Sequence, residues 1–528
     1  MVAVVHIELV GIQRFVFGSR TLKDTIGRSS MINEFTTAGV AGVAARWPQG
    51  RVETVYAAAG RLSVVVREGR AADFVGWFTR EVADTCDGLR AVVVVDSCAD
   101  EAAVVESVRG AGHAVRAARH RQLPSLAGAA PWGALMCAVT GRAAEGVDQN
   151  DVPWAGDVPR AEKWGAVWHG RQQAELLTGS DSVFAGDLEL PVRTDQLGRS
   201  VGETSRVAVL VADLNGVGAR LRVLAGHDPD GSRVAAASAA LTELGAALGQ
   251  HLVATVVGAL VADSSGSPVV SGFPASLSFP LHRESADGPW LLPLRPWVLA
   301  GDDLVLVCES RIVWSLACAI TDWLDAPEVA ADDPRAVLAG LFGARLTVGI
   351  GIAVVAVGYP LIRAHESAAV LCENAKAAAR RVSEDEGVAH HGVDWYRGGV
   401  DAQTVVARRD HSTTARPYLF TSQRTSGSFA EFTRSWLGTG ETSLRGPVFD
   451  DHHGWCRERL GDAAVDPRPG AVDRALRSLN RARAVAGSSA ADLVSRDSGV
   501  ILDAVDLLDD HLMLIQAGVR VRDEAVTP

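Results

Sequence analysis

Hydrophobic and polar positions in the first 121 residues alternate between short β-branched runs and helical patterns. An apolar strand is predicted at 2–10, and two more strands, at 52–56 and 62–66, form a hairpin. The remaining elements expected here are helices at 29–45, 71–86 and 101–121 and a strand at 89–95. This β-α-β-β-α-β-α order predicts an α+β domain of the ferredoxin-like or palm type, with antiparallel strands in its sheet.

The same order of elements begins again after residue 200. A strand at 207–212 and a turn at 213–218 precede a long helical pattern at 232–262. A loop rich in Pro, Gly and Ser at 263–293 leads to a β-hairpin at 297–307. The elements expected after the hairpin are helices at 311–324 and 361–381 and strands at 346–356 and 393–396. The chain therefore contains two copies of one palm-like unit.

Two further segments have a different composition. Residues 122–200 combine several prolines and tryptophans with polar residues, which indicates a small connecting module. Residues 401–528 are more polar, and their later part has helical periodicity, so we expect a C-terminal helical domain. The predicted domains are thus 1–121, 122–200, 201–400 and 401–528.

Composition narrows the class of protein. The chain has 528 residues, 48% of them hydrophobic and 22% charged, which is ample for buried cores. A formal net charge of −12 disfavours direct binding to DNA and unaided binding to RNA. The N-terminus lacks the pattern of a secretion signal, and the apolar run at 346–361 is interrupted by glycines and a proline. Seven scattered cysteines without a C-x-x-C pair indicate reduced core residues, so we expect a cytoplasmic protein that does not span a membrane.

Two adjacent carboxylates mark the hairpin at 297–307. Its tip reads Ala300-Gly301-Asp302-Asp303, which is compatible with an ordinary turn whose acids are solvated. Adjacent carboxylates repel each other, however, and a metal ion is a common way to neutralise them. The palm order places the end of the strand at 207–212, and with it Asp213, beside this tip. The first copy has Gly60 and Arg61 at the corresponding hairpin, so only the second copy has the acids.

Three carboxylates brought together in this way can bind two Mg²⁺ ions and support attack of a hydroxyl on a nucleotide phosphate. Gly216 and Gly218 would let backbone N–H groups approach a triphosphate, although a strand-to-helix turn uses glycine equally well. Lys376 could reach the same phosphates, and its alternative role is that of a solvated helix lysine.

Other acidic and histidine-containing groups are weaker candidates. Residues 450–453 (Asp-Asp-His-His) lie in an irregular polar stretch without a further ligand at suitable spacing. The His227-Asp228 dipeptide is isolated, and residues 509–511 fit the solvated face of a helix. The sequence contains neither a G-x-x-x-x-G-K-[ST] loop nor a G-x-S-x-G elbow, which excludes P-loop and α/β-hydrolase chemistry.

Four stretches resemble the large, palm-containing polymerase subunit of type III CRISPR effector complexes and, more distantly, GGDEF-type nucleotide cyclases. They are 11–17 with 27–30, 212–218, the Ala-Gly-Asp-Asp turn at 300–303, and 349–361 with Ala375-Lys376. The resemblance implies two facing palms, the second of which joins ATP molecules 3′ to 5′ into cyclic oligoadenylates for antiviral defence.

The resemblance also implies roles for individual residues. Asp213, Asp302 and Asp303 would bind Mg²⁺ or Mn²⁺, Lys376 would contact the triphosphate, and Ser238 would lie near the base. The backbone around the acids would complete the nucleotide site, at Leu214, Asn215, Gly216, Gly218 and Gly301.

The chain also departs from this family. The first palm is predicted to start at residue 2, so we expect no HD nuclease domain ahead of it, and the position of the family's zinc module has a single cysteine, Cys137. We therefore expect neither DNA cleavage nor a zinc site. The partners implied are effector subunits carrying guide and target RNA. Two alternatives remain open: a cyclase that makes a cyclic mono- or dinucleotide, and a non-catalytic palm scaffold in a ribonucleoprotein.

Overall fold

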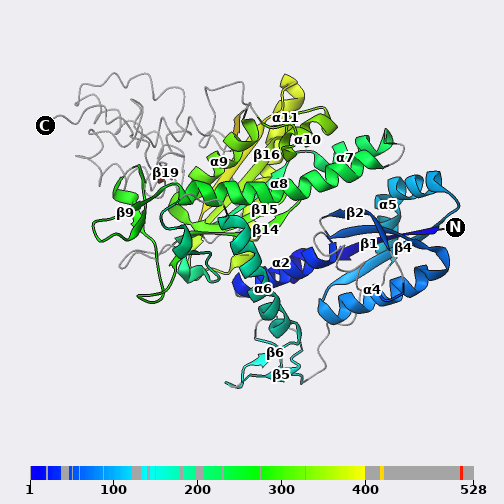
Figure 1. Cartoon of the computed structure of the whole chain (residues 1–528), viewed down its shortest axis with the longest axis horizontal. Coiled ribbons are helices and arrows are strands. Elements are labelled where there is room, and N and C mark those ends of the chain that lie inside the picture. Colours follow the sequence, from blue (N-terminus) through cyan, green and yellow to red (C-terminus); the bar gives the residue numbers. More distant parts are fainter. Residues whose placement is uncertain are drawn as a thin grey trace, which may run out of the picture.

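The computed structural model shows two α+β units side by side, with a narrow module projecting from one side (Figure 1). Within residues 2–398 it describes all but short segments, and it describes two pieces of the tail, 417–420 and 512–514. The segments that are not described within 2–398 are 19–21, 37–46, 50–51, 59, 87, 122–132, 139–142, 149, 179–181, 198–205, 229–230, 274 and 327–328. The C-terminal helical domain predicted for 401–528 lies almost entirely outside the described residues.

The first palm is built on a four-stranded sheet. Its strands are β1 (Val2–Val10), β2 (Glu53–Ala58), β3 (Arg61–Arg67) and β4 (Arg90–Cys98), in the spatial order β2-β3-β1-β4 with antiparallel neighbours. The helices of this unit are α1 (Ile12–Phe17), α2 (Leu22–Thr36), α4 (Ala71–Thr85) and α5 (Glu101–Arg121). This strand order is the one that two interleaved β-α-β units produce, because each crossover leaves room for one strand between its two parallel strands.

The second palm repeats this topology. Its sheet has the order β14-β15-β8-β16 followed by β17 and β18. The strands are β8 (Arg206–Leu214), β14 (Leu294–Ala300), β15 (Asp303–Glu309), β16 (Val348–Ala356), β17 (His391–Arg397) and β18 (Tyr418–Phe420). The helices are α7 (Val217–Gly226), α8 (Ser232–Val257), α9 (Val313–Asp325), α10 (Pro334–Phe342) and α11 (Leu361–Glu386). The α+β class and the duplicated palm predicted from the sequence are therefore confirmed.

The side chains of the central strands in the second sheet contribute to two hydrophobic cores, one on each face of the sheet. One face packs under α8 and α9 through residues such as Ala208, Leu210 and Leu306. The opposite face joins the core of the first palm through Val207, Val209 and Val307, together with Phe15 and Phe17 of α1. Successive side chains of a strand point to opposite faces, so a strand that is apolar throughout can be buried on both sides. The two palms thus share one hydrophobic core.

A long helix that the sequence analysis missed crosses both units. Helix α6 (Asp157–Leu177) lies in the segment interpreted as a connecting module, and it packs along α2 and against α8. Pro159 had indicated a loop, but it lies in the first helical turn, where no intrahelical N–H bond is lost. The rest of the described module is mostly irregular, with the two-residue strands β5 (Gly146–Val147) and β6 (Pro153–Trp154) near its tip.

The start of α2 was also predicted wrongly. A helix is predicted at 29–45, but α2 begins at Leu22, so that Gly27 lies inside it. Its role is a close helix crossing, because a Cβ at Gly27 would lie 1.9 Å from the carbonyl oxygen of Ala161 in α6. Gly165 contributes to the same crossing, where an added Cβ would lie 2.8 Å from the carbonyl oxygen of Lys23.

The loop predicted at 263–293 contains regular structure. Strands β9 (Leu260–Ala262), β10 (Pro268–Val270) and β12 (Phe279–Pro280) form a three-stranded sheet, so the helix predicted to reach residue 262 ends at Val257. Two shorter pairs join β13 (Trp290–Leu291) to β7 (Leu188–Glu189) and β11 (Gly272–Phe273) to β19 (Met513–Leu514).

Helix α8 is long and apolar enough, by length and composition, to cross a membrane, but half of its most apolar window is buried inside the protein. It is the only such helix in the described part of the chain. Its buried positions include Leu244, Leu248 and Leu252, as expected of a helix that covers a sheet.

Candidate active site

Asp213 and Asp303 lie directly opposite each other on the paired strands β8 and β15. Asp213 belongs to the central strand, since Gly349 of β16 is its partner on the other side. Asp303 begins β15 directly after a two-residue turn in which Gly301 has a φ of +66°, a conformation that favours glycine. Opposed residues of an antiparallel pair have Cβ atoms about 4.5–5.5 Å apart, so the two carboxylates are held close together by the sheet itself.

The first palm has an ion pair at the same register. Glu8 of β1 is the cross-strand partner of Arg61 of β3, and the Arg61 Nη2 lies 2.9 Å from the Glu8 Oε1. A glycine also follows the strand acid by three residues in both palms, Gly11 after Glu8 and Gly216 after Asp213. Gly11 and Gly216 both have positive φ values, of 89° and 75°, and precede the helices α1 and α7. The duplication therefore retains the backbone and changes the charge: an ion pair in one copy and two acids in the other.

Lys376 of α11 places a positive charge beside these acids. Its Nζ lies 2.5 Å from the Asp213 Oδ2 and 3.6 Å from the Glu373 Oε1. The lysine can lie flat across β16 because residue 349 is glycine: an added Cβ would meet the Lys376 Cγ at 2.2 Å. Burial lowers the pKa of Lys376, but the hydrogen bond and the attraction of Asp213 outweigh burial, so the net shift is upward. Lys376 is therefore a charged ammonium at neutral pH, paired with the Asp213 carboxylate.

The pKa values of the three acids are all raised. Burial raises the pKa of Asp213, and its hydrogen bond to Lys376 opposes this shift. Burial also raises the pKa of Asp302. For Asp303, the surrounding protein and the charges of Asp302 and Asp213 raise the pKa to about 7. The Asp303 side chain is open to water, and its raised pKa reflects negative charge at the hairpin tip beyond what Lys376 balances.

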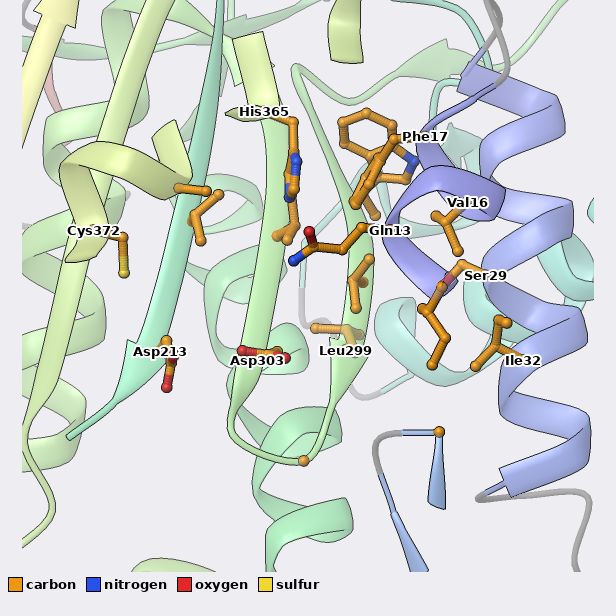
Figure 2. A pocket seen from close by; sticks show the side chains of 18 of the residues that line it. Gln13, Val16, Phe17, Ser29, Ile32, Asp213, Leu299, Asp303, His365 and Cys372 are labelled. Carbon is orange, nitrogen blue, oxygen red and sulfur yellow. The ribbon is translucent and has the colours of Figure 1, made fainter. Parts of the chain in front are cut away.

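A cavity of about 430 Å³ lies between the two palms, and the acids form one end of it. Figure 2 shows Asp213 and Asp303 side by side at this end, with His365 and Phe17 farther along. The walls come from both palms and from α6. The lining residues include Gln13, Val16, Phe17 and Gly60 of the first palm; Trp168, Gln172 and Glu175 of α6; and Asp213, Trp297, Gly301, Asp303, His365 and Glu373 of the second palm. Its volume is in the range of small-ligand sites.

The donor set at this end suits a magnesium ion that is completed by substrate and water. No group of three His, Cys, Asp or Glu side chains in the described residues converges on a metal position. Asp213 and Asp303 line the cavity, whereas Asp302 occupies the turn and does not. Asp303 makes no hydrogen bond or ion pair with described residues, so its oxygens are available to a cation. Mg²⁺ commonly uses one or two carboxylates together with phosphates and water. The three-carboxylate metal site stays a prediction.

Of the other residues implied by the resemblance, Gly301 lines the cavity, whereas Leu214, Asn215, Gly216, Gly218 and Ser238 do not. Leu214 is buried in the second palm's core, and Gly216 and Gly218 are exposed at the start of α7. Ser238 is buried on α8, one turn before Thr242, which does line the cavity. These backbone and base contacts therefore stay predictions.

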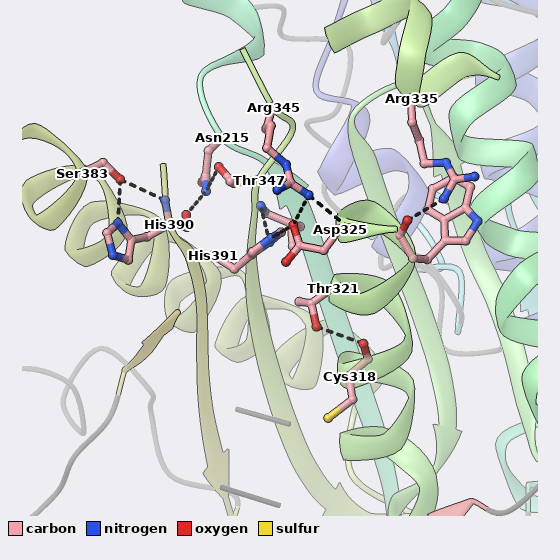
Figure 3. Close-up of polar contacts among 12 residues, drawn as sticks. Asn215, Cys318, Thr321, Asp325, Arg335, Arg345, Thr347, Ser383, His390 and His391 are labelled. Atoms are coloured by element: carbon pink, nitrogen blue, oxygen red, sulfur yellow. Dashed lines mark hydrogen bonds and ion pairs between the residues drawn. The ribbon is translucent and has the colours of Figure 1, made fainter. Parts of the chain in front are cut away.

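Asn215 has a structural role in this arrangement. Its Nδ2 donates to the Thr347 Oγ1 at 3.0 Å and to the His390 carbonyl at 3.1 Å (Figure 3). The backbone N–H of Asn215 donates to the Thr347 carbonyl at 2.7 Å. Because its carboxamide donors are engaged by the protein, Asn215 fixes the chain that follows Asp213.

A second set of contacts supports the same strand ends. The backbone N–H of Val348 donates to the His391 Nδ1 at 3.2 Å, which leaves the His391 Nε2–H to donate to the Asp325 Oδ1 at 3.2 Å. Arg345 Nη2 donates to the same oxygen at 3.2 Å. These contacts tie β16 and β17 to the end of α9, so the strand that lies beside Asp213 has little freedom to move.

The far walls of the cavity were not predicted from the sequence. Trp168, Gln172 and Glu175 lie on a helix that was not predicted, and His365 lies in the helix predicted at 361–381, where it was not a candidate site residue. Gln172 is held in place by Arg295, whose Nη2 donates to the Gln172 Oε1 at 2.7 Å while its Nη1 lies 2.8 Å from the His169 Nδ1. The sequence feature that could have indicated these walls was Arg295, a charged residue in the mostly apolar strand before the acidic turn, and the structure shows it to be buried.

Comparison with known proteins identifies the architecture. No family model matches the chain, and no curated protein matches it. The apo Csm1–Csm4 cassette is similar to it with a TM-score of 0.53 and 14% identity, over 96% of this chain and 70% of that chain. Csm1 of T. onnurineus gives 0.52 and 14%, over 97% and 70%. The Csm1–Csm4 cassette in complex with AMPPNP gives 0.51 and 13%, over 96% and 70%. The chain thus has the fold of Csm1, a palm-domain subunit of type III CRISPR complexes.

Proposed function

We propose that this protein is a Mg²⁺-dependent nucleotidyltransferase that converts ATP into a cyclic oligoadenylate. The observation that carries the proposal is the pair Asp213 and Asp303, which face one cavity between two palms with Lys376 beside them. A related fold crystallised with AMPPNP supports a nucleotide as the ligand. The first palm, with Glu8 and Arg61 at the same register, would serve as a wall of the site and not as a second catalytic centre.

In the proposed reaction, the 3′-hydroxyl oxygen of one ATP forms a bond to the α-phosphorus of another. The bond from that phosphorus to the bridging oxygen breaks, pyrophosphate leaves, and the hydroxyl proton goes to solvent. Asp213 and Asp303 would hold Mg²⁺, which when bound offsets phosphate charge and favours loss of the hydroxyl proton. Lys376 would add a positive charge for the triphosphate, and the apolar walls of the cavity would hold and orient the remainder of the nucleotide.

The proposal includes a protein partner and a cellular location. Two of the similar structures are cassettes of Csm1 with Csm4, so we propose that this chain works with a subunit of that kind, in the cytoplasm. The net charge of −12 fits RNA contact through partner subunits.

Incubation of the protein with labelled ATP and Mg²⁺, with and without effector subunits and a target RNA, tests the proposal. We expect cyclic oligonucleotide and pyrophosphate from the wild type and at least a hundredfold less from Asp303→Ala. The double variant Asp302→Ala/Asp303→Ala should likewise lose product while remaining folded. The matched control is Arg61→Ala at the same register of the first palm, which should retain product. A product of another ring size would favour the cyclase alternative. No product and no ATP binding under any condition would favour the scaffold.

A further inference from the structure

The end of the cavity away from the acids contains a buried histidine. His365 of α11 is 6% exposed and lines the cavity. Its ring stacks on Phe17 of α1 with 3.7 Å between centroids, and Trp297 packs edge-on against Phe17 at 4.7 Å. The histidine is thus held by aromatic side chains from both palms, which fixes the direction in which its ring edge points.

The ring nitrogens of His365 have no hydrogen-bond partner among the described residues, and unlike the indole nitrogen of Trp297 they are not fully buried. Burial lowers the pKa of His365 to about 4, so the ring is neutral at physiological pH and presents one donor and one acceptor. A buried polar group with both functions unused is costly unless water or a ligand supplies partners.

Gln13 of α1 is the second polar group of this region. Figure 2 shows its side chain extending from α1 across the cavity toward His365. Its carboxamide makes no hydrogen bond with described residues, so it too offers a donor and an acceptor. Apolar side chains surround the pair: Val16, Phe17, Trp297 and Val298. An uncharged flat heterocycle with hydrogen-bonding edges fits such a region better than a phosphate does, because none of the described residues that line the cavity is a lysine or an arginine.

We propose that His365 and Gln13 form a subsite for the nucleobase of the substrate, with the phosphates directed toward Asp213, Asp303 and Lys376. This inference rests on the proposed function, because it takes the ligand to be a nucleotide. It assigns base recognition to a histidine of the second palm and a glutamine of the first, so each palm contributes one hydrogen-bonding group. The aromatic walls would stack on the base and contribute affinity that depends little on which base is present.

Calorimetric titration of the purified chain with ATP and with inorganic tripolyphosphate, both in Mg²⁺, tests the subsite. His365→Phe retains the stacking on Phe17 and removes the hydrogen bonds. We expect it to weaken ATP binding at least tenfold and to leave tripolyphosphate binding unchanged. His365→Gln, which restores a donor and an acceptor, should recover part of the loss. Gln13→Leu should weaken ATP binding in the same selective way.

His251→Phe is the matched control, because His251 also stacks on an aromatic side chain, Trp323, outside the cavity. Equal ATP affinity in wild type and His365→Phe, with both folded, would overturn the base subsite and leave the proposed function intact. Equal loss of ATP and tripolyphosphate binding would also overturn it. A wild type that binds neither ligand would overturn the proposed function itself. Thermal unfolding of each variant distinguishes these outcomes from misfolding, and His365→Gln provides a second variant if the phenylalanine is not tolerated.

Discussion

Asp213 and Asp303 occupy the register position at which Glu8 and Arg61 form an ion pair in the first palm. The same pairing of strands therefore carries opposite charges in the first palm and two like charges in the second. In the first palm the charges cancel across the strands, whereas in the second the repulsion is relieved only in part, by Lys376 from a neighbouring helix. The residual negative charge is a property of the folded chain and can be measured without a substrate.

The stability of metal-free protein should reveal the raised pKa of Asp303. A carboxyl group whose pKa is about 7 in the folded chain and about 3.9 when unfolded binds its proton more tightly in the folded state. This contribution favours folding at low pH and is lost as pH rises from about 4 through about 7. The asparagine of Asp303→Asn cannot ionise, so the variant avoids this loss of stability as pH rises. It should therefore melt at a higher temperature than wild type at pH 8 in EDTA, with the difference shrinking toward pH 4. A difference independent of pH would contradict the shift.

Removal of the Lys376 charge should affect both folding and ligand binding. Lys376→Met leaves the half-buried Asp213 carboxylate without its ion-pair partner, so we expect a loss of about 1–3 kcal/mol in the free energy of unfolding. It should also weaken tripolyphosphate binding at least tenfold. Lys23→Met is the control: Lys23 lies 4.0 Å from Glu162 with both side chains largely exposed, and should contribute less than about 1 kcal/mol. Similar effects of the two substitutions, measured by urea unfolding, would mean that the Asp213 pair is unimportant for stability.

Gly351 allows α11 to approach the central sheet. A Cβ at this position would lie 2.0 Å from the Ala368 carbonyl oxygen and 2.3 Å from the Cys372 backbone nitrogen. Gly351→Ala therefore has to push the helix that carries Lys376 and His365 away from the sheet, which should cost about 1–3 kcal/mol. Gly340→Ala on α10, where an added Cβ meets open space, should be neutral or stabilising. Urea unfolding measures the stability of both variants. A Gly351→Ala variant as stable as wild type would contradict the close contact between α11 and the sheet at this position.

Arg295 should be the most sensitive of the charged core positions. It is fully buried, burial lowers its pKa to about 9, and it donates to Gln172 and His169 of α6. Arg295→Ala leaves a void and an unpaired Gln172 oxygen, so we expect a loss of about 2–5 kcal/mol. Arg193→Ala, whose side chain is 56% exposed and pairs with Asp195 and Glu284, should lose less than about 1 kcal/mol. Thermal melts of both variants test this contrast.

The sequence predicted the elements that have a local pattern. The hairpin and its acids followed from two short apolar β-type runs around Gly301, and the predicted helix at 101–121 coincides with α5. The pairing of Asp213 with Asp303 followed from the strand order of the duplicated unit. These features depend on backbone hydrogen bonding and on burial within a single element.

Features that depend on contacts between distant elements were not predictable in this way. Gly27 resembles a helix boundary in sequence, and only its contact with Ala161 of α6 explains why it lies inside a helix. His365 follows the helical pattern of α11, and only Phe17, brought from the first palm, makes it a cavity wall. The type and order of most elements follow from the sequence within each element, whereas a cavity follows from how the elements meet.

The crossing of α2 and α6 at Gly27 and Gly165 has a consequence for how this chain can be divided. Residues 12–60 supply one wall of the cavity, and residues 168–373 supply the others, including the acids. Two polypeptides made by cutting the gene between the palms would each have an intact sheet and an open half-site. They would need to reassemble at the glycine crossing before a nucleotide could be enclosed, so dilution would inactivate the split protein and spare the continuous one.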